Sequence, residues 1–161
     1  MQRWGVLRHG SHMNDAEVYA EVRADLMRYA TALVGVADAA DLVSAVVTRV
    51  LERRGGLHAL DDPKPYLMKA VLNEARMRHR SKTRQKRAVA VLGGGGHVEP
   101  RHDEVLDLVM DLPARQRAAA FLAYYEQYTP MEIAGLMGCH PGTVRRYLHL
   151  ARKKLKEVLD E

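Results

Sequence analysis

The sequence has one cysteine, few aromatic residues and no long apolar run, and each shortage excludes a class of protein. Among its 161 residues the single cysteine is Cys139, which excludes an internal disulfide framework and a cysteine-based zinc finger. Aromatic residues make up 6% of the chain. No apolar run approaches the roughly 18 residues of a membrane span, and no secretory leader pattern is present. These absences predict a cytoplasmic protein without membrane insertion.

Motifs of catalysis and of cofactor binding are also missing. The sequence shows no paired carboxylates in an acid/base motif and no nucleophile elbow. Four consecutive glycines at residues 93–96 do not form a phosphate loop, because no helix with Lys-Ser/Thr follows them. The eight histidines are scattered without the spacing of a metal site. We therefore expect no enzymatic activity, no catalytic or metal-binding residue and no cofactor.

Positive charge is in excess and unevenly placed. Lys and Arg number 25 against 20 Asp and Glu, which gives a net charge of +5 and a pI near 9.5. This balance is compatible with a nucleic-acid partner but does not identify one. Residues 76–87, RMRHRSKTRQKR, contain seven cations and no acid. Such a run is either a solvated helix end or a face that neutralises phosphates, and the apolar opposite face of the same segment favours the second.

Apolar residues recur at helical spacing, which predicts an all-α protein of two small domains. Three amphipathic helices are expected at residues 15–33, at about 38–54 with Asp38 as N-cap, and from residue 62 onward. We expect two domains, a three-helix unit at residues 13–87 and a four-helix unit at residues 102–161. A flexible glycine-rich linker at residues 88–101 joins them. Residues 1–12 are expected to be a tag or a disordered extension. The four shorter helices of the second unit are expected around 103–111, from 113, from about 130, and at 141–159.

The segment YTPMEIAGLMGCHPGTVRRYLHLARKKL has the pattern of a helix-turn-helix. Thr129 and Glu132 suit a capping box, Gly138 suits the turn, and His140 is in place to cap the second helix. Exposed amides at the start of that helix hold phosphate, and its arginines reach base edges. A surface αα-corner is the alternative, and the basic bias of the second helix favours DNA. The DNA-binding residues predicted here are His140, Gly142, Thr143, Arg145, Arg146 and Arg152.

Five short motifs occur in register in residues 112–155. They are Leu-Pro, Arg-Gln-Arg, Tyr-Tyr-Glu, Glu-Ile-Ala and Gly-Thr-Val. This segment resembles region 4 of bacterial sigma-70-type RNA polymerase sigma factors, specifically the extracytoplasmic-function (ECF) group. Cys139 and His140 depart from that family, which usually has an aliphatic residue and Ser there. Neither departure breaks the fold, although a His cap is weaker than a Ser cap.

The basic helix and the residues before it are similar to region 2 of the same family, which meets the −10 promoter element. The matching residues are an Asp-Pro start at 62–63, Tyr66 and Asn73. We expect Tyr66 to lie in the core rather than stack on a base, and Asn73 either to face DNA or to satisfy a buried hydrogen bond. The loop at 53–61 corresponds to the place where the family captures a −10 base, through backbone and His58 here. The residues implied for the −10 region are His58, Asn73, Arg76, Arg80, Lys82 and Arg84.

The second predicted helix corresponds to the surface on which the family docks to RNA polymerase. The family pattern there is roughly Asp-Leu-Val-Gln-Glu, whereas residues 41–45 read Asp-Leu-Val-Ser-Ala. Loss of the Gln-Glu pair predicts weaker docking or the use of neighbouring groups. The polymerase-binding residues implied are Asp41, Leu42, Ser44, Ala45 and Arg49.

The resemblance implies an ECF-type sigma factor that binds core RNA polymerase and directs it to −35 and −10 promoter elements. Its expected partners are core RNA polymerase and promoter DNA, with an anti-sigma factor as a third. Two other interpretations stay open. One is a stand-alone helix-turn-helix transcriptional regulator, and the other is a sigma-like interaction protein held by an anti-sigma factor.

Overall fold

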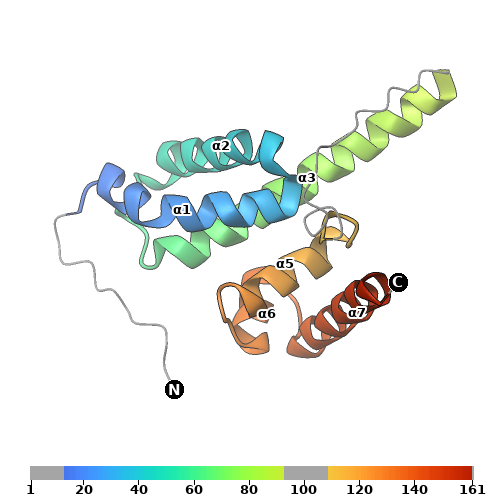
Figure 1. Ribbon diagram of the computed structural model, residues 1–161. Helices are drawn as coiled ribbons and strands as arrows, with labels where there is room; N and C mark the ends of the chain where they lie inside the picture. The colour runs from blue at the N-terminus through green and yellow to red at the C-terminus, as the bar shows by residue number, and fades with distance from the viewer. Residues whose placement is uncertain (1–12, 93–108, 161) are drawn as a thin grey trace.

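A computed structural model describes residues 13–92 and 109–160, and every regular element within them is an α-helix. The helices, labelled as in Figure 1, are α1 (Asp15–Val34), α2 (Val36–Arg54), α3 (Pro63–Leu92), α5 (Ala114–Tyr124), α6 (Pro130–Met137) and α7 (Pro141–Leu159). Helices α1, α2 and α3 lie side by side as one unit, and α5, α6 and α7 form a second unit against it. The predicted all-α fold is confirmed.

Helix α1 supplies much of the core of the first unit. It begins with a capping box, in which the Asn14 side chain accepts a hydrogen bond from the Glu17 amide at 3.0 Å and the Glu17 carboxylate accepts one from the Asn14 amide at 2.9 Å. Its buried side chains recur every three or four residues and are Val18, Val22, Leu26, Tyr29, Ala30 and Leu33. A fully buried Leu of this kind contributes about 1.5–3 kcal/mol. This stripe packs α1 against α2 and α3.

Glycines set both ends of α2. Gly35 joins α1 to α2 at φ 87°, and Gly55 ends α2 in the left-handed conformation at φ 73°. Because α2 begins at Val36, Asp38 lies inside its first turn, and the prediction of Asp38 as the N-cap was wrong. Its carboxylate accepts a hydrogen bond from Lys82 of α3 at 2.9 Å instead. The start of α2 is thereby tied to the middle of α3.

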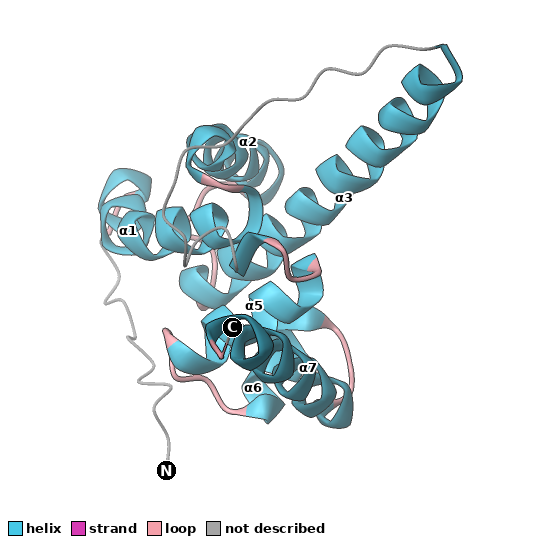
Figure 2. Ribbon diagram, turned by 45° about the vertical axis from the view of Figure 1, so that its right-hand side comes forward, coloured by secondary structure: helices cyan, strands magenta, loops and turns pink. Residues whose placement is uncertain are grey.

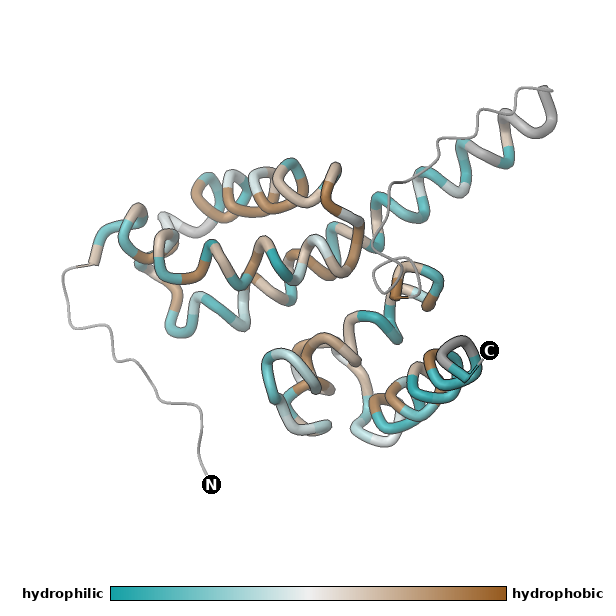
Figure 3. Tube along the Cα trace, viewed as in Figure 1, coloured by the Kyte–Doolittle hydropathy of each residue, from teal (hydrophilic) through white to brown (hydrophobic). Residues whose placement is uncertain are grey.

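Helix α3 is longer than the sequence pattern indicated. It begins at Pro63 and continues for 30 residues, through 88–92, which were expected to belong to the linker. Its first half packs in the core, whereas its second half projects beyond the other helices and carries mostly hydrophilic turns (Figures 1 and 3). The glycines at 93–96 and most of the helix expected at 103–111 lie outside the described residues. A basic helix end is therefore presented to solvent.

Aromatic rings join the two units. The Phe121 ring of α5 lies 5.2 Å from the ring of Tyr29, which is buried in α1, measured between centroids. On its other side Phe121 stacks on Tyr125 at 4.9 Å, and the Arg28 guanidinium lies 5.3 Å from the Tyr125 ring centre. Apolar packing thus crosses from α1 to α5.

The guanidinium of Arg117 adds a polar link at the same boundary. Its Nη2 donates to the Leu33 carbonyl near the end of α1 at 2.7 Å. Its Nη1 donates to the carbonyls of Met110 and Leu112 at 2.5 and 2.9 Å. One side chain therefore supplies a donor to the end of α1 and two donors to the backbone that leads into α5.

Candidate nucleic-acid interface

Helices α6 and α7 form the predicted helix-turn-helix. The Thr129 side chain accepts from the Glu132 amide at 3.3 Å, and the Glu132 carboxylate accepts from the Thr129 amide at 2.7 Å, which completes the capping box. Gly138 makes the turn at φ 63°. The apolar residues between the two helices are buried, namely Ile133, Ala134, Met137, Val144 and Leu148. The predicted motif is present in full.

His140 caps α7, as predicted. Its Nδ1 accepts a hydrogen bond from the Gly142 amide at 3.0 Å. A Cβ on Gly142 would lie 3.2 Å from this nitrogen, so the glycine leaves room for the imidazole ring. This gives Gly142 a local structural role besides the DNA binding predicted from the sequence. The cap uses one of the first amides of α7, and the positive end of the helix stays exposed.

The first turns of α7 divide cleanly into a packed face and an exposed face. Val144 and Leu148 are buried, whereas Arg145 and Arg146 are exposed. Arg152 lies two turns further along, also exposed, with its Nε donating to the Leu148 carbonyl at 3.2 Å. Helix-turn-helix proteins place the N-terminal residues of the second helix against base edges. Two of the predicted readers thus have the exposure that base contact requires.

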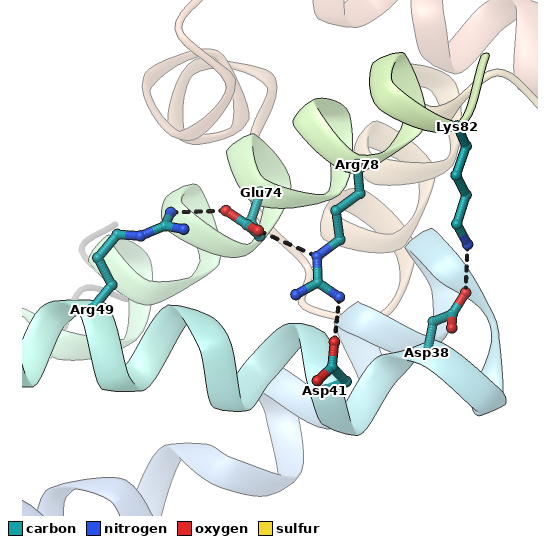
Figure 4. Close-up of polar contacts among 6 residues, drawn as sticks. All are labelled: Asp38, Asp41, Arg49, Glu74, Arg78 and Lys82. Atoms are coloured by element: carbon teal, nitrogen blue, oxygen red, sulfur yellow. Dashed lines mark hydrogen bonds and ion pairs between the residues drawn. The ribbon is translucent and has the colours of Figure 1, made fainter. Parts of the chain in front are cut away.

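The basic run of α3 separates into two stripes. Arg78 and Lys82 turn toward α2 and pair with its acidic residues (Figure 4). Arg76, Arg80 and Arg84 lie on a different stripe, with no acidic partner among the described residues. Partial burial, and then the like charges of Arg115 and Arg80, lower the pKa of Arg76. This second stripe is thus a site of unneutralised positive charge suited to phosphates.

The loop before α3 forms a hollow of about 360 Å³. It is lined by Ala59, Leu60, Asp61, Asp62 and Tyr66. The prediction that Tyr66 lies in the core was wrong, since 36% of its surface is exposed. Asn73, two turns along α3, is exposed as well, so it does not satisfy a buried hydrogen bond. The sequence predicted that this loop captures a −10 base through its backbone and His58. The hollow instead presents the ring of Tyr66 and the carboxylates of Asp61 and Asp62.

His58 is turned away from this hollow toward the start of α1. Its amide donates to Asp15 Oδ1 at 3.0 Å, and its Nδ1 lies 2.6 Å from the same oxygen. These hydrogen bonds lower the pKa of Asp15. The neighbouring Gly56 has φ 114°, and a Cβ there would lie 2.7 Å from the Asp15 carboxylate. His58 thus anchors the loop, and neither Asp15 nor Gly56 was singled out from the sequence.

The predicted polymerase-docking residues of α2 differ in accessibility. The Asp41 side chain is 78% exposed and Ser44 is exposed, with Ala45 half-buried beside it. Leu42 is fully buried in the core, so a direct contact with another protein is closed to it. Arg49 is exposed but engaged, because its Nη1 donates to Glu74 at 2.7 Å. The exposed part of this face therefore centres on Asp41.

The chain is similar to known proteins both in its second unit and over nearly its whole length. The family model "Sigma-70, region 4" matches residues 102–155, which include α6 and most of α7. The RNA polymerase sigma-E factor of Streptomyces avermitilis is 29% identical over 164 residues, which cover 96% of this chain and 89% of that protein. The sigma factor RpoE of Bartonella quintana, solved in complex with the anti-sigma factor NepR, has a similar fold. Its TM-score is 0.71 at 22% identity, over 90% of this chain and 96% of that one.

The fold and the exposed arginines of α7 define a two-unit helical protein with a DNA-binding helix-turn-helix. Residues 102–155 belong to the sigma-70 region 4 family, and the chain is similar over nearly its whole length to an RNA polymerase sigma-E factor. Its function is that of a sigma factor in transcription initiation.

Two further observations concern what the described part of the chain contains. None of its helices combines the length and the apolarity that crossing a bilayer demands. In the same residues, His, Cys, Asp and Glu side chains form no group of three that could hold a metal ion.

Proposed function

We propose that this sigma factor directs core RNA polymerase to promoters by reading the −35 element with residues 102–161 and engaging the −10 element with residues 13–87. The observation that carries the proposal is the presence of two separate cationic faces, the start of α7 and the unpaired stripe of α3, on two units of one chain. Each face is of a kind that binds DNA. The chain supplies binding and positioning, and the polymerase supplies the chemistry, so we infer no enzymatic activity of its own.

At the −35 element, Arg145 and Arg146 are the proposed base readers. Both side chains are exposed on the first turns of α7, and arginine donates in bidentate fashion to guanine O6 and N7. The amides beside Gly142 and Thr143 are placed to hold a phosphate at the helix N-terminus. Phosphate contacts set the register, and the arginines supply the sequence preference.

At the −10 element, the hollow beside Tyr66 is the proposed place for an unstacked base. The Tyr66 ring offers a surface for stacking, which contributes about 1–3 kcal/mol per base in single-strand binding. Asp61 and Asp62 line the same hollow, and carboxylates accept hydrogen bonds from an exocyclic amino group such as that of cytosine. Arg80 and Arg84, about four and five turns further along α3, would hold phosphates further along the same strand.

Engagement of both elements requires the two units to separate. The elements lie about 25 base pairs apart, roughly 85 Å along B-DNA. A compact chain of this length has a radius of gyration of about 15 Å, so it spans about half that distance. The contacts of Phe121 with Tyr29 and of Arg117 with Leu33 hold the units together in the structure. We infer that they break when the promoter is bound.

The remaining partners are proposed from the same faces. Core polymerase would dock at Asp41 and Ser44 on α2, and the chain would work in the cytoplasm, where its template lies. An anti-sigma factor is proposed as a third partner, supported by the complex in which the similar sigma factor RpoE was solved.

Gel filtration with purified core RNA polymerase tests the proposal. The chain should co-elute with the core enzyme, and the complex should shift promoter DNA that the chain alone binds weakly. Tight promoter binding by the chain alone, with no affinity for core, would favour a stand-alone regulator instead.

A further inference from the structure

Four charged side chains form a continuous relay between α2 and α3 (Figure 4). Arg49 Nη1 donates to Glu74 Oε2 at 2.7 Å, and Glu74 Oε1 accepts from Arg78 Nε at 3.2 Å. Arg78 Nη1 then donates to Asp41 Oδ2 at 2.6 Å. One guanidinium therefore holds two carboxylates from different helices, and we call the set Arg49–Glu74–Arg78–Asp41 the relay.

The relay is buried at its centre and open at its outer end. Glu74 is the only charged residue in the described part of the chain that is buried with its backbone counted, with 8% of the whole residue exposed. Burial by itself raises the pKa of Glu74, but the hydrogen bonds from Arg49 and Arg78 outweigh it and leave the pKa below its ordinary value. The Asp41 side chain, in contrast, is 78% exposed. Arg78 is thus held by the buried Glu74 carboxylate on one side and bonds the exposed Asp41 carboxylate on the other.

This placement gives Arg78 a role different from the other cations of its run. Its side chain is 29% exposed, and its Nε and Nη1 already donate to two carboxylates that offset its charge, so it is poorly placed to bind a phosphate. It does touch the one acidic side chain of the predicted docking face. A charged side chain held in one rotamer loses less conformational freedom when a partner binds it.

We propose that Arg78 is a positioning residue for polymerase docking, which holds the Asp41 carboxylate in place and couples the docking face of α2 to the DNA-facing helix α3. The inference rests on the proposed docking at Asp41. Glu74 and Arg49 support Arg78, and Lys82 with Asp38 forms a separate pair one turn along α3.

A double-mutant cycle on the affinity of the full chain for core RNA polymerase tests the proposal. Asp41→Asn is expected to weaken binding about tenfold, and Arg78→Gln about three- to tenfold. The double variant should bind no more weakly than Asp41→Asn alone, because Arg78 has nothing to position once the carboxylate is gone. Arg23→Gln, which removes an exposed cation from α1, is the matched control and should leave the affinity unchanged.

Each other outcome is decisive. Additive losses in the double variant, or an unchanged affinity in Arg78→Gln beside a loss in Asp41→Asn, would overturn the positioning role and leave docking at Asp41 intact. Unchanged affinity in Asp41→Asn would overturn both, and no binding by the wild type would refute the proposed function itself. If Arg78→Gln fails to fold because Glu74 loses a partner, Glu74→Gln/Arg78→Gln removes the buried charge as well and takes its place in the cycle.

Discussion

Lys64, in the first turn of α3, donates a hydrogen bond to Glu126 at 2.7 Å, across the boundary between the two units. The same ammonium lies 2.7 Å from Asp25 of α1. Glu126 is nearly buried, with 7% of its side chain exposed, and its second oxygen has no partner in the described residues. One lysine thus pairs with two carboxylates where the units meet, and Arg28 also pairs with Asp25.

Replacing this lysine should loosen the contact between the units. Lys64→Met leaves Glu126 without its cation, which is expected to cost about 1–3 kcal/mol at the boundary. Energy transfer between dyes on the two units should fall as they separate. Lys69→Met, which removes an exposed lysine from the same helix, is the control and should not change the transfer. Equal transfer in both variants would contradict the role given to Lys64.

Acid should destabilise the first unit at the same cluster, because Asp25, Arg28 and Lys64 all lie on α1 and α3. Burial raises the pKa of Asp25, but the hydrogen bonds from Lys64 and Arg28 outweigh burial, and the net pKa is below the ordinary value of 3.8. A carboxyl whose pKa is lowered by folding stabilises the fold fully above its ordinary pKa, and this contribution is lost as the pH falls through the lowered value. The free energy of unfolding should therefore decrease as the pH falls below about 4, and it should decrease less in Asp25→Asn, which has no carboxyl group to protonate. Equal decreases in the wild type and in Asp25→Asn would argue against this.

Cleavage in the glycine segment tests whether the contact between the units persists in solution. Four consecutive glycines predict that a protease cuts near residues 93–96. Because Phe121 and Arg117 contact α1 directly, the two fragments should stay associated at low protein concentration and co-elute on gel filtration. Fragments that elute separately would mean that the units are independent when free.

The two stripes of α3 should differ in their response to salt. Arg80→Gln removes a cation that has no acidic partner in the described residues, so the slope of log affinity for DNA against log salt should decrease by about one. Lys82→Gln should change the slope less, because Lys82 is already paired with Asp38. The measurement is a salt titration of the polymerase-bound protein on promoter DNA. Equal changes in slope would show that the ion pair with Asp38 does not persist on DNA.

Much of the fold could be predicted because periodicity and local capping residues determine it. The sequence predicted a helix at residues 15–33, and α1 ends one residue later, at Val34. It also predicted Thr129 and His140 as the N-caps of α6 and α7. The end of α3 was placed too early, because residues 88–92 stand next to glycines and were assigned to the linker. Local patterns describe a helix well and describe its last turns poorly.

Contacts between distant segments could not be predicted in the same way. Nothing near Lys64 in the sequence points to Glu126, and nothing in the basic run separates Arg78 and Lys82 from Arg80. The helical positions of these cations differ, but only the location of α2 shows which side is neutralised. The exposure of Tyr66 could have been inferred, because it shares a stripe of α3 with Asn73.

Base reading by α7 is tested by substitution of its two exposed arginines. Arg145→Ala and Arg146→Ala should each cost about 1–3 kcal/mol on a matched promoter and relax the preference at one position of the −35 element. Lys153→Ala, on the same helix and paired with Glu157, should leave the ratio of matched to scrambled binding unchanged. If the ratio of matched to scrambled binding is also unchanged in Arg145→Ala and in Arg146→Ala, α7 does not read the promoter sequence.

Transcription in vitro tests the central claim most directly. Purified core RNA polymerase, the chain and a promoter with matched −35 and −10 elements should give a run-off transcript of defined length. The transcript should disappear when the chain is omitted, and it should weaken when the −35 element is scrambled. Promoter binding by the chain with no transcript from the core enzyme at any promoter that it binds would contradict the assignment of this chain as a functional sigma factor.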